Sequence, residues 1–374
     1  MEPETAVGRV FFPQLTGIRF FAAFVVLCHH FAPDLPIAGF ASLISRAGDA
    51  GVSLFFMLSG FVLTISNRKL DGSMVKNRPD YLVGRFARIY PQYFFSFLFC
   101  APFVLATTFD KYPDHLAAAA RLIVNGGAYL LLVQSWIPML ANAWNGPGWS
   151  LSTETFFYIA FLFITPPRPE ALWKWAAASM AVLFGAAFMV QYVSGPEGLH
   201  FWYFFPPMRF GEFALGCCVA QIYRLNLYPR RMSDHSSILC VLCLFAVIVG
   251  GTTGNMLAAR IATTLAWPML ILALAVGDGI FVRGLSVRPL IALGEASYGL
   301  YLIQGPMVYV FNLVTGRDPA PRFENGSEFL AYATMAILAS LVLYYLWERP
   351  AERFIKRRWK LYRAASMRGA FSMN

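Results

Sequence analysis

An apolar stretch near the start of the sequence carries side chains that can do chemistry. Residues 15–31 are almost all hydrophobic, yet Arg19 stands near their beginning and His30 near their end. A charged side chain at the centre of a membrane helix costs about 2.5–3.5 kcal/mol on insertion scales, so such residues face a protein interior or a wet cavity. On a helix, Arg19 and His30 lie on nearly the same face, roughly 16 Å apart, whereas His29 lies about 80° to the other side. We therefore predict a polar stripe that includes Arg19 and His30 but not His29.

Histidine, glutamate and arginine side chains together suit the transfer of an acyl group from a thioester to an alcohol. This reaction needs a base for the hydroxyl proton and a positive site for the phosphates of a coenzyme A donor. Neutral imidazole is the side-chain base best matched to pH 7, which favours His30, and Glu154 is the candidate that orients the imidazole. Arg85 and Arg88, with Arg19, are the candidate phosphate ligands, because guanidinium groups bind phosphate bidentately.

Composition places these residues in a membrane protein. The 374 residues are 58% hydrophobic, 16% aromatic and only 13% charged, which is typical of a chain that mostly faces lipid or other buried helices. The formal net charge of +10 is explained by basic loops held on the cytoplasmic side, so we expect no nucleic-acid partner. The six cysteines lie in apolar segments; we expect them to be small buried side chains and predict no metal site.

Eleven apolar runs follow one another along the chain, at about residues 15–31, 51–66, 89–109, 122–137, 149–166, 172–193, 204–222, 237–253, 260–278, 290–313 and 328–347. Basic residues indicate which runs cross the membrane, because cytoplasmic loops are enriched in Lys and Arg. If 122–137 crossed, the basic linkers near 168–174, 224–231 and 283–288 would face outward. The sequence therefore predicts an all-α bundle of about ten transmembrane helices, with 122–137 re-entrant or interfacial and both termini cytoplasmic.

This topology sorts the embedded polar residues into two zones. Toward the outer half of the membrane we expect His30, Glu154, Arg209 and Glu212. At or near the inner face we expect Arg19, Arg85, Arg88, Glu295 and Glu348. Two polar zones that face opposite compartments indicate a reaction or a transport path across the membrane.

Six ordered motifs resemble those of acyltransferase family 3. They are Arg19 with His30, Gly51-Val-Ser-Leu-Phe-Phe-Met-Leu-Ser-Gly-Phe61, Arg85-Phe-Ala-Arg88-Ile-Tyr-Pro91, Trp149-Ser-Leu-Ser-Thr-Glu154, Arg209-Phe-Gly-Glu212-Phe-Ala-Leu-Gly216 and Ser297-Tyr-Gly-Leu-Tyr-Leu302. The resemblance extends from about Leu15 to about Arg353. It implies a membrane acyltransferase domain at 15–353, between a cytoplasmic segment at 1–14 and a basic cytoplasmic tail at 354–374.

The resemblance implies a multi-pass enzyme of the inner membrane. Such enzymes move an acyl group, often acetyl, from cytoplasmic acyl-CoA to a hydroxyl of a glycan, polysaccharide or small-molecule acceptor. Acyl-CoA is then a substrate, and no permanently bound cofactor is expected. In the family, the histidine that matches His30 is regarded as catalytic and the arginines that match Arg19, Arg85 and Arg88 as required. From the other motifs we take as candidate substrate-binding residues Arg209, Glu212, Trp149 and Tyr301.

Three positions depart from the family pattern. Ser53 stands where many members carry Asp, Thr155 where a second carboxylate is often seen, and Gln304 where His is common. The resemblance therefore assigns no role to these positions. Some members also carry a hydrolase-like extension outside the cytoplasm, and this sequence shows none. We accordingly expect transfer to the acceptor either directly or through a partner protein.

Each candidate also has a purely structural explanation. His30 can be a satisfied interfacial histidine, and Arg85 and Arg88 can be anchors at the cytoplasmic surface. Glu154 can be part of an N-terminal helix cap.

Two further motifs have structural explanations of the same kind. Arg209 and Glu212, three residues apart, can neutralise one another. Ser59-Gly60 suits close helix packing better than a nucleophilic Ser59, because no base lies near it in the sequence.

Two other function classes fit parts of the pattern. A secondary transporter or exporter of a polar metabolite or glycan precursor also has many spans and buried charges, but the sequence shows no inverted repeat and no matched pair of broken helices. A structural membrane subunit leaves the embedded Arg, His and Glu residues unexplained. An O-acyltransferase is therefore the leading hypothesis.

The predicted orientation can be tested with single cysteines in a background that lacks the native thiols. The loop 138–148 is expected outside, together with 32–49 and 315–327, whereas Arg230 lies in a basic linker that is expected inside. An impermeant maleimide added to intact spheroplasts should label Asn142→Cys and leave Arg230→Cys unlabelled. Labelling of Arg230→Cys from outside would overturn the arrangement.

Overall fold

Helices make up nearly all of the described residues, which in this computed structural model are 11–32, 48–69, 71–164, 166–193, 195–317, 323 and 325–371. The α-helices are α1 (Pro13–Phe31), α3 (Gly48–Asn67), α4 (Arg78–Lys111), α5 (His115–Leu130), α6 (Trp149–Ala160), α7 (Leu172–Phe188), α8 (Pro196–Phe204), α9 (Pro206–Arg224), α10 (Ser236–Thr252), α11 (Met256–Val276), α12 (Ile280–Leu285), α13 (Arg288–Thr315), α14 (Gly326–Leu343) and α15 (Arg349–Phe371). Single 3-10 turns lie at Gln134–Trp136, Pro138–Leu140, Gly146–Gly148, Pro169–Ala171 and Arg230–Met232, and π-helical turns at Met189–Val193 and Tyr344–Glu348. Within these ranges there is no strand, only an isolated antiparallel bridge between Arg68 and Met74. The predicted all-α fold is confirmed.

Asparagine and aspartate side chains begin four of the helices. The side chains of Asn77, Asp114, Asn255 and Asn325 accept hydrogen bonds from backbone N–H groups in the first turns of α4, α5, α11 and α14. The first four N–H groups of a helix have no partner within the helix, so each cap stabilises its helix by about 1 kcal/mol.

Six helical segments are long and apolar enough to cross a bilayer, by length and composition over the described residues. They are Pro13–Phe31, Gly48–Asn67, Arg78–Lys111, Pro169–Val193, Met256–Val276 and Gly326–Ser366. The helices α9 and α13, of 19 and 28 residues, have the length but carry more polar side chains, and α10 is apolar but shorter. The prediction of a helical membrane bundle is therefore confirmed, and the number of crossings stays a prediction.

The predicted re-entrant run 122–137 is not a continuous element. Helix α5 begins earlier, at His115, and ends at Leu130. Leu132 then has a φ of 58°, in the left-handed region, and single turns continue to the start of α6. The end of α5 and the beginning of an irregular segment, which leads to α6, thus replace the predicted single run. Irregular backbone within a membrane protein is tolerated where it lines a cavity, and this segment does so, as shown below.

Helices α3 and α9 cross in direct backbone contact at two glycines. A Cβ atom at Gly60 would lie 2.1 Å from the carbonyl oxygen of Phe213, and one at Gly216 would lie 2.0 Å from that of Met57. No larger side chain fits at either position unless the helices separate. The close-packing interpretation of Ser59-Gly60 is therefore correct for Gly60.

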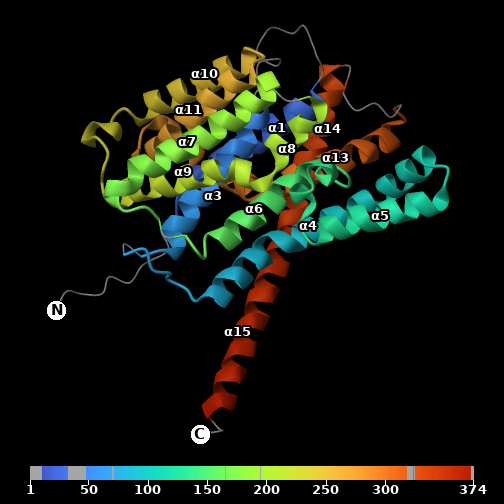
Figure 1. The fold of residues 1–374 in the computed structure, drawn as a ribbon, viewed down its shortest axis with the longest axis horizontal. Helices are drawn as coiled ribbons and strands as arrows, with labels where there is room; N and C mark the ends of the chain where they lie inside the picture. Colours follow the sequence, from blue (N-terminus) through green and yellow to red (C-terminus); the bar gives the residue numbers. More distant parts are fainter. Residues whose placement is uncertain are drawn as a thin grey trace.

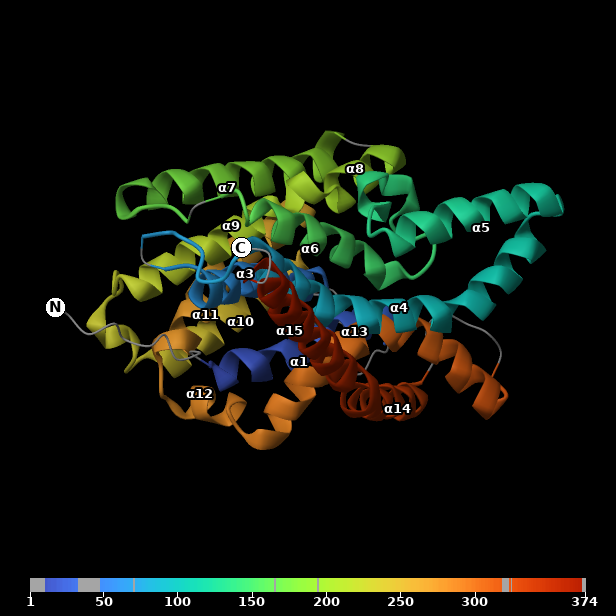
Figure 2. The ribbon, with the colours of Figure 1, turned by 90° about the horizontal axis from the view of Figure 1, so that it is seen from below.

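The helices that carry the predicted site lie in the middle of the molecule. In Figure 2, α5, α7 and α8 lie along one side and α12 and α14 along the other, with α1, α3 and α6 between them. Figure 1 shows α15 projecting away from the bundle, with the C-terminus at its far end. The predicted basic tail at 354–374 is thus helical as far as Phe371.

Candidate active site

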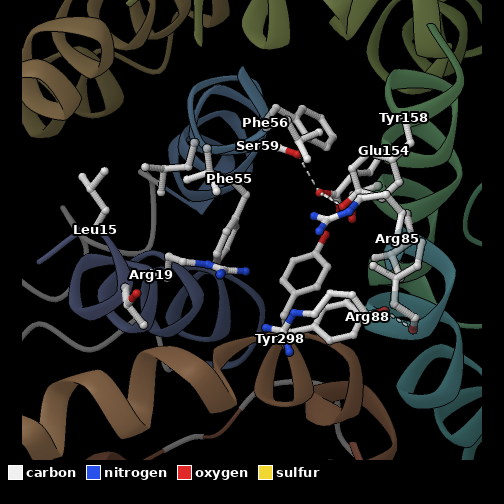
Figure 3. A pocket seen from close by; sticks show the side chains of 18 of the residues that line it. Leu15, Arg19, Phe55, Phe56, Ser59, Arg85, Arg88, Glu154, Tyr158 and Tyr298 are labelled. Atoms are coloured by element: carbon white, nitrogen blue, oxygen red, sulfur yellow. Dashed lines mark hydrogen bonds between the residues drawn. The ribbon is translucent and has the colours of Figure 1, made fainter. Parts of the chain in front are cut away.

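Five helices enclose a cavity of about 280 Å³, which we call the arginine pocket. Its polar lining residues include Arg19 from α1, Ser59 from α3, Arg85 and Arg88 from α4, Glu154 and Tyr158 from α6, and Tyr298 from α13. Figure 3 shows the Arg19 side chain reaching into this cavity from one side, with Arg85 and Glu154 on the other. The three arginines predicted to bind phosphate therefore line one cavity, although α1 and α4 are far apart in the sequence.

A second cavity, of about 220 Å³, lies near the other end of α1, and we call it the histidine pocket. Its lining includes His29 and His30 from α1, Asp49 from α3, Trp149 from α6, Tyr203 and Phe204 from α8, and Tyr301 from α13. The irregular segment after α5 contributes Asn142, Gly146 and Pro147. This pocket therefore combines hydrogen-bonding groups with aromatic rings.

The two pockets occupy opposite ends of the helices they share. Along α1, Arg19 lines the arginine pocket and His30 the histidine pocket, and helical geometry separates the two by roughly 16 Å. Along α3 the order is reversed, with Asp49 in the histidine pocket and Ser59 in the arginine pocket, as in an antiparallel neighbour. Val52 and Tyr301 line both pockets. These two side chains therefore form the wall between them.

Arg88 is held by acidic residues near the junction of α14 and α15. It forms an ion pair with Glu348, and its Nη1 lies 3.9 Å from Oε2 of Glu352. Glu348 is only 1% exposed, so its carboxylate depends on this partner. Arg88 thus connects α4 to the C-terminal helix, and its charge is largely balanced within the protein.

Arg19 and Arg85 form no ion pair within the described part of the chain. The guanidinium carbon of Arg19 lies 5.8 Å from the ring centre of Phe55, and that of Arg85 lies 5.9 Å from the ring centre of Tyr158. The Nε atom of Arg85 is buried without a hydrogen-bond partner. Both arginines are partly buried, and two guanidinium groups without an ion pair around one cavity make a site suited to an anion.

Glu154 lies in the arginine pocket and not, as predicted, in the same polar zone as His30. Its Oε1 accepts hydrogen bonds from Ser59 Oγ at 3.0 Å and from the Tyr158 hydroxyl at 2.6 Å. The prediction that Glu154 shares a zone with His30 and orients the imidazole is therefore wrong. The physical reason is the direction in which the side chains of α6 point. Trp149 lines the histidine pocket, but Ser150, Leu151, Glu154 and Tyr158 of the same helix line the arginine pocket. Nor is Glu154 a cap, because α6 begins without a side-chain cap.

Both histidines line the histidine pocket, so the prediction that only His30 faces the polar stripe is wrong. His30 Nδ1 lies 3.4 Å from Oε1 of Gln304 on α13. The His29 ring packs against Gly48, where a Cβ atom would lie 2.1 Å from His29 Cβ. The pocket is formed by the start of α3 as well as by α13, so it contacts two faces of α1.

A buried charge cluster stands behind the histidine pocket. Arg209 and Glu212 of α9 form an ion pair at 3.0 Å, and Arg260 of α11 pairs with Glu212 and, at 3.1 Å, with Asp49. Ser53 accepts hydrogen bonds from Arg260 at 2.9 Å and from Arg209 at 3.3 Å. Arg209 and Glu212 do neutralise one another, but as part of a cluster of two positive and two negative side chains.

This cluster supports the aromatic lining of the histidine pocket. The guanidinium carbon of Arg209 lies 5.4 Å from the ring centre of Trp149 and 5.2 Å from that of Tyr203. Asp49 accepts a hydrogen bond from the Tyr203 hydroxyl. Neither Arg209 nor Glu212 lines the histidine pocket, so the structure places these two predicted substrate-binding residues one layer behind it, whereas Trp149 and Tyr301 line it.

Asp49 and Arg260 were missed from the sequence. Asp49 falls in the expected outer loop 32–49, and Arg260 coincides with the first residue of the apolar run 260–278. Both were therefore treated as boundary residues. The sequence does contain one indication of this cluster, which is Arg260 itself. An arginine at the start of an apolar segment needs an acidic partner inside the protein.

The two pockets offer imidazole, carboxylate and guanidinium groups for chemistry. Among the described residues, no group of three or more His, Cys, Asp or Glu side chains is arranged to hold a metal ion. The residues in place can accept a proton, donate hydrogen bonds and bind an anion.

Comparison with known proteins gives a consistent result. A family model described as an acyltransferase domain matches residues 12–345. The chain is 32% identical over 372 residues to acyltransferase MdmB of Streptomyces mycarofaciens, a match that covers 92% of this chain and 93% of that protein. It is 24% identical to O-acetyltransferase OatA of Staphylococcus aureus, over 87% of this chain and 55% of OatA. It is 23% identical to the putative peptidoglycan O-acetyltransferase YrhL of Bacillus subtilis, over 91% of this chain and 55% of YrhL.

The chain thus spans about half the length of OatA and YrhL but nearly all of MdmB. No solved structure gives a significant match. The family match covers most of the chain, including α1 with its Arg19 and His30, both pockets and the charge cluster. By these matches, and by the six motifs in its sequence, the chain belongs to acyltransferase family 3.

Proposed function

We propose that this protein transfers a short acyl group, such as acetyl, from acyl-CoA to a hydroxyl group of a glycan or small-molecule acceptor. The observation that carries the proposal is the pair of pockets on either side of one thin wall. One pocket holds guanidinium groups suited to an anionic donor, and the other holds imidazole and aromatic groups suited to a hydroxylated acceptor. Because Val52 and Tyr301 border both pockets, a thioester and a hydroxyl bound on the two sides would meet there.

Donor binding is assigned to the arginine pocket. Coenzyme A carries a 3′-phosphate and a diphosphate, and guanidinium groups bind such oxyanions through charge-assisted hydrogen bonds. Arg19 and Arg85 are the ligands best placed for this, since neither is engaged by a carboxylate in the described structure. The apolar lining around Phe55 and Phe56 suits the pantetheine arm and the acyl chain.

Acceptor binding is assigned to the histidine pocket. The rings of Trp149 and Tyr203 present flat apolar faces, and Asp49 and Asn142 present hydrogen-bonding groups. This combination suits a sugar, which has both apolar C–H faces and hydroxyl groups. The similarity to OatA, an O-acetyltransferase, and to YrhL, a putative peptidoglycan O-acetyltransferase, supports a hydroxyl acceptor of the glycan type.

The chemical step follows from this arrangement. The His30 imidazole takes the proton of the acceptor hydroxyl while the hydroxyl oxygen bonds to the thioester carbonyl carbon. The tetrahedral intermediate then collapses, the carbon–sulfur bond breaks, and the proton carried by His30 passes to the thiolate of coenzyme A. Tyr301, which borders both pockets, contacts both substrates in this scheme. Glu154 receives a role on the donor side, where its carboxylate accepts hydrogen bonds from Ser59 and Tyr158.

We further propose that the protein is a multi-pass protein of the inner membrane with both termini in the cytoplasm. In this orientation the arginine pocket opens to cytoplasmic acyl-CoA and the histidine pocket to the opposite side. The support is the distribution of Lys and Arg among the linkers. The acyl group would then be the only part of the donor that changes sides.

The proposed activity can be tested with the purified protein in proteoliposomes. Acetyl-CoA is the probe donor, and chitotetraose and octyl glucoside are the probe acceptors, a glycan and a small glycoside. Release of free coenzyme A should depend on an acceptor, and mass spectrometry should find the acceptor heavier by one acetyl group. Uptake of an acceptor into vesicles that lack acetyl-CoA, with no acetylated product, would instead support a transporter.

Arg85 and Arg88 should respond differently to substitution. Arg85→Ala should raise the KM for acetyl-CoA by about tenfold with little change in kcat, because a lost phosphate contact weakens the ground state and the transition state alike. Arg85→Lys should recover only part of the loss, since the planar fork is missing. Arg88→Ala should instead lower the amount of folded protein, because it leaves the buried Glu348 without a partner.

The matched control for Arg88 is the double variant Arg88→Ala with Glu348→Gln. Removing both charges should restore much of the folded protein, as measured by detergent-solubilised yield and thermal unfolding. A normal yield of Arg88→Ala together with a raised KM for acetyl-CoA would place Arg88 in the donor site.

The two adjacent histidines provide a matched pair for the base assignment. His30→Gln keeps hydrogen-bonding groups but cannot take up a proton, so kcat should fall by at least about two orders of magnitude. His29→Gln should keep most of the activity, although its side chain lines the same pocket. Initial rates should be normalised to folded protein. An active His30→Gln beside an inactive His29→Gln would transfer the role of base to His29.

A further inference from the structure

We propose that Gln304 is a positioning residue for His30, which fixes the imidazole proton on Nδ1 and so makes Nε2 the basic nitrogen. The inference deepens the proposed function and rests on the assignment of His30 as the base. Gln304 is one of the positions to which the sequence motifs assign no role. The juxtaposition that suggests the role is the contact of 3.4 Å between His30 Nδ1 and Gln304 Oε1.

The Gln304 side chain is held in one orientation. It is fully buried on α13, with 0% exposure. Its Nε2 donates a hydrogen bond to the backbone carbonyl of Tyr301 at 2.9 Å, one turn earlier on the same helix. If the amide were turned over, its oxygen would face that carbonyl oxygen, and two acceptors would meet without a proton between them. The donor end of the amide is therefore committed to Tyr301, and the acceptor end is directed to His30.

This orientation selects one form of the neutral imidazole. The Gln304 oxygen can only accept a hydrogen bond, so a hydrogen bond across this 3.4 Å contact requires a proton on Nδ1 of His30. In a neutral imidazole with a proton on Nδ1, the lone pair is on Nε2. An amide oxygen thus does for His30 what a carboxylate does in a catalytic triad, which is to set the tautomer and the ring orientation.

An amide differs from a carboxylate in one consequence for catalysis. It orients the ring without adding a negative charge that would favour the imidazolium form. The other titratable groups that face this region come from several elements: His29 on α1, Asp49 on α3, Tyr203 on α8, Tyr301 on α13 and Tyr332 on α14. Of these, Asp49 is engaged by Arg260, Arg209 and Tyr203. The amide therefore orients the His30 ring without adding a negative charge beside it.

The test compares three variants, assayed with acetyl-CoA and whichever of chitotetraose and octyl glucoside is the better acceptor. Gln304→Met keeps the length of the side chain and removes the acceptor, and Gln304→Glu replaces the amide by a titratable carboxyl group. Tyr332→Phe is the matched control, because its hydroxyl bonds to the backbone oxygen of Gln304 at 2.7 Å and not to the amide. Each variant is measured for folded yield, kcat, KM for acetyl-CoA and the pH dependence of kcat.

The expected results differ among the variants. Gln304→Met should lower kcat at least about tenfold with KM for acetyl-CoA unchanged, since only the base is disturbed. In a plot of kcat against pH, activity falls at low pH as the base becomes protonated. Gln304→Glu should move this acidic limb to higher pH by about one unit or more, because the carboxylate stabilises the protonated imidazole. Tyr332→Phe should keep the wild-type limb and kcat even if its folded yield falls.

Two outcomes would overturn the inference and can be told apart from a failure of the proposed function. If Gln304→Met folds less well but keeps the wild-type kcat per folded molecule, Gln304 has only a structural role. If Gln304→Glu leaves the acidic limb in place, the amide does not face the base. In either case an inactive His30→Gln would leave the proposed function standing, whereas an active His30→Gln would remove the base assignment itself.

Discussion

Charge neutrality within the bundle is the constraint on which the rest of the structure depends. Asp49, Arg209, Glu212 and Arg260 are brought together from α3, α9 and α11, and their charges cancel. Removing one partner of a buried ion pair costs about 3–5 kcal/mol, because an uncompensated charge stays behind. The three helices are therefore fixed relative to one another by a requirement that is stricter than apolar packing. The Trp149 ring, which lines the histidine pocket, is held in place as well, because it packs against the Arg209 guanidinium group.

The same constraint distinguishes the arginines of the donor side. Arg88 satisfies it through Glu348, and so ties α4 to the π-helical turn that precedes α15. Arg19 and Arg85 have aromatic rings nearby but no carboxylate in ion-pair contact within the described residues. In a membrane protein such an arrangement is unfavourable until an anion arrives. Whether an arginine has a carboxylate partner, more than its position in a motif, therefore distinguishes a structural arginine from a candidate phosphate ligand.

The elements and the arginine pocket could be predicted from the sequence because both leave local signals. Long apolar runs mark the helices, and charges within those runs mark Arg19 and Arg209 as residues that face protein. Arg85 stands just before the run 89–109 and is marked by its motif. The partners could not be predicted, since Arg260 meets Asp49 across 211 positions of sequence. Depth along a helix was equally hard to judge. Trp149 and Glu154 belong to one sequence motif, but on α6 they line different pockets, and the sequence carries no signal for that division.

The wall of Val52 and Tyr301 has a second consequence, which concerns the membrane potential of the cell. A continuous water-filled path through the protein would conduct protons and ions and dissipate the membrane potential, which is worth about 2.3 kcal/mol per elementary charge at 100 mV. Two separate cavities that share, among the described residues, only these lining side chains interrupt such a path. In the proposed orientation, a group of a few atoms can be handed across the barrier while water and ions stay on their own sides. The insulation of the membrane is then maintained by the residues at which the two substrates meet.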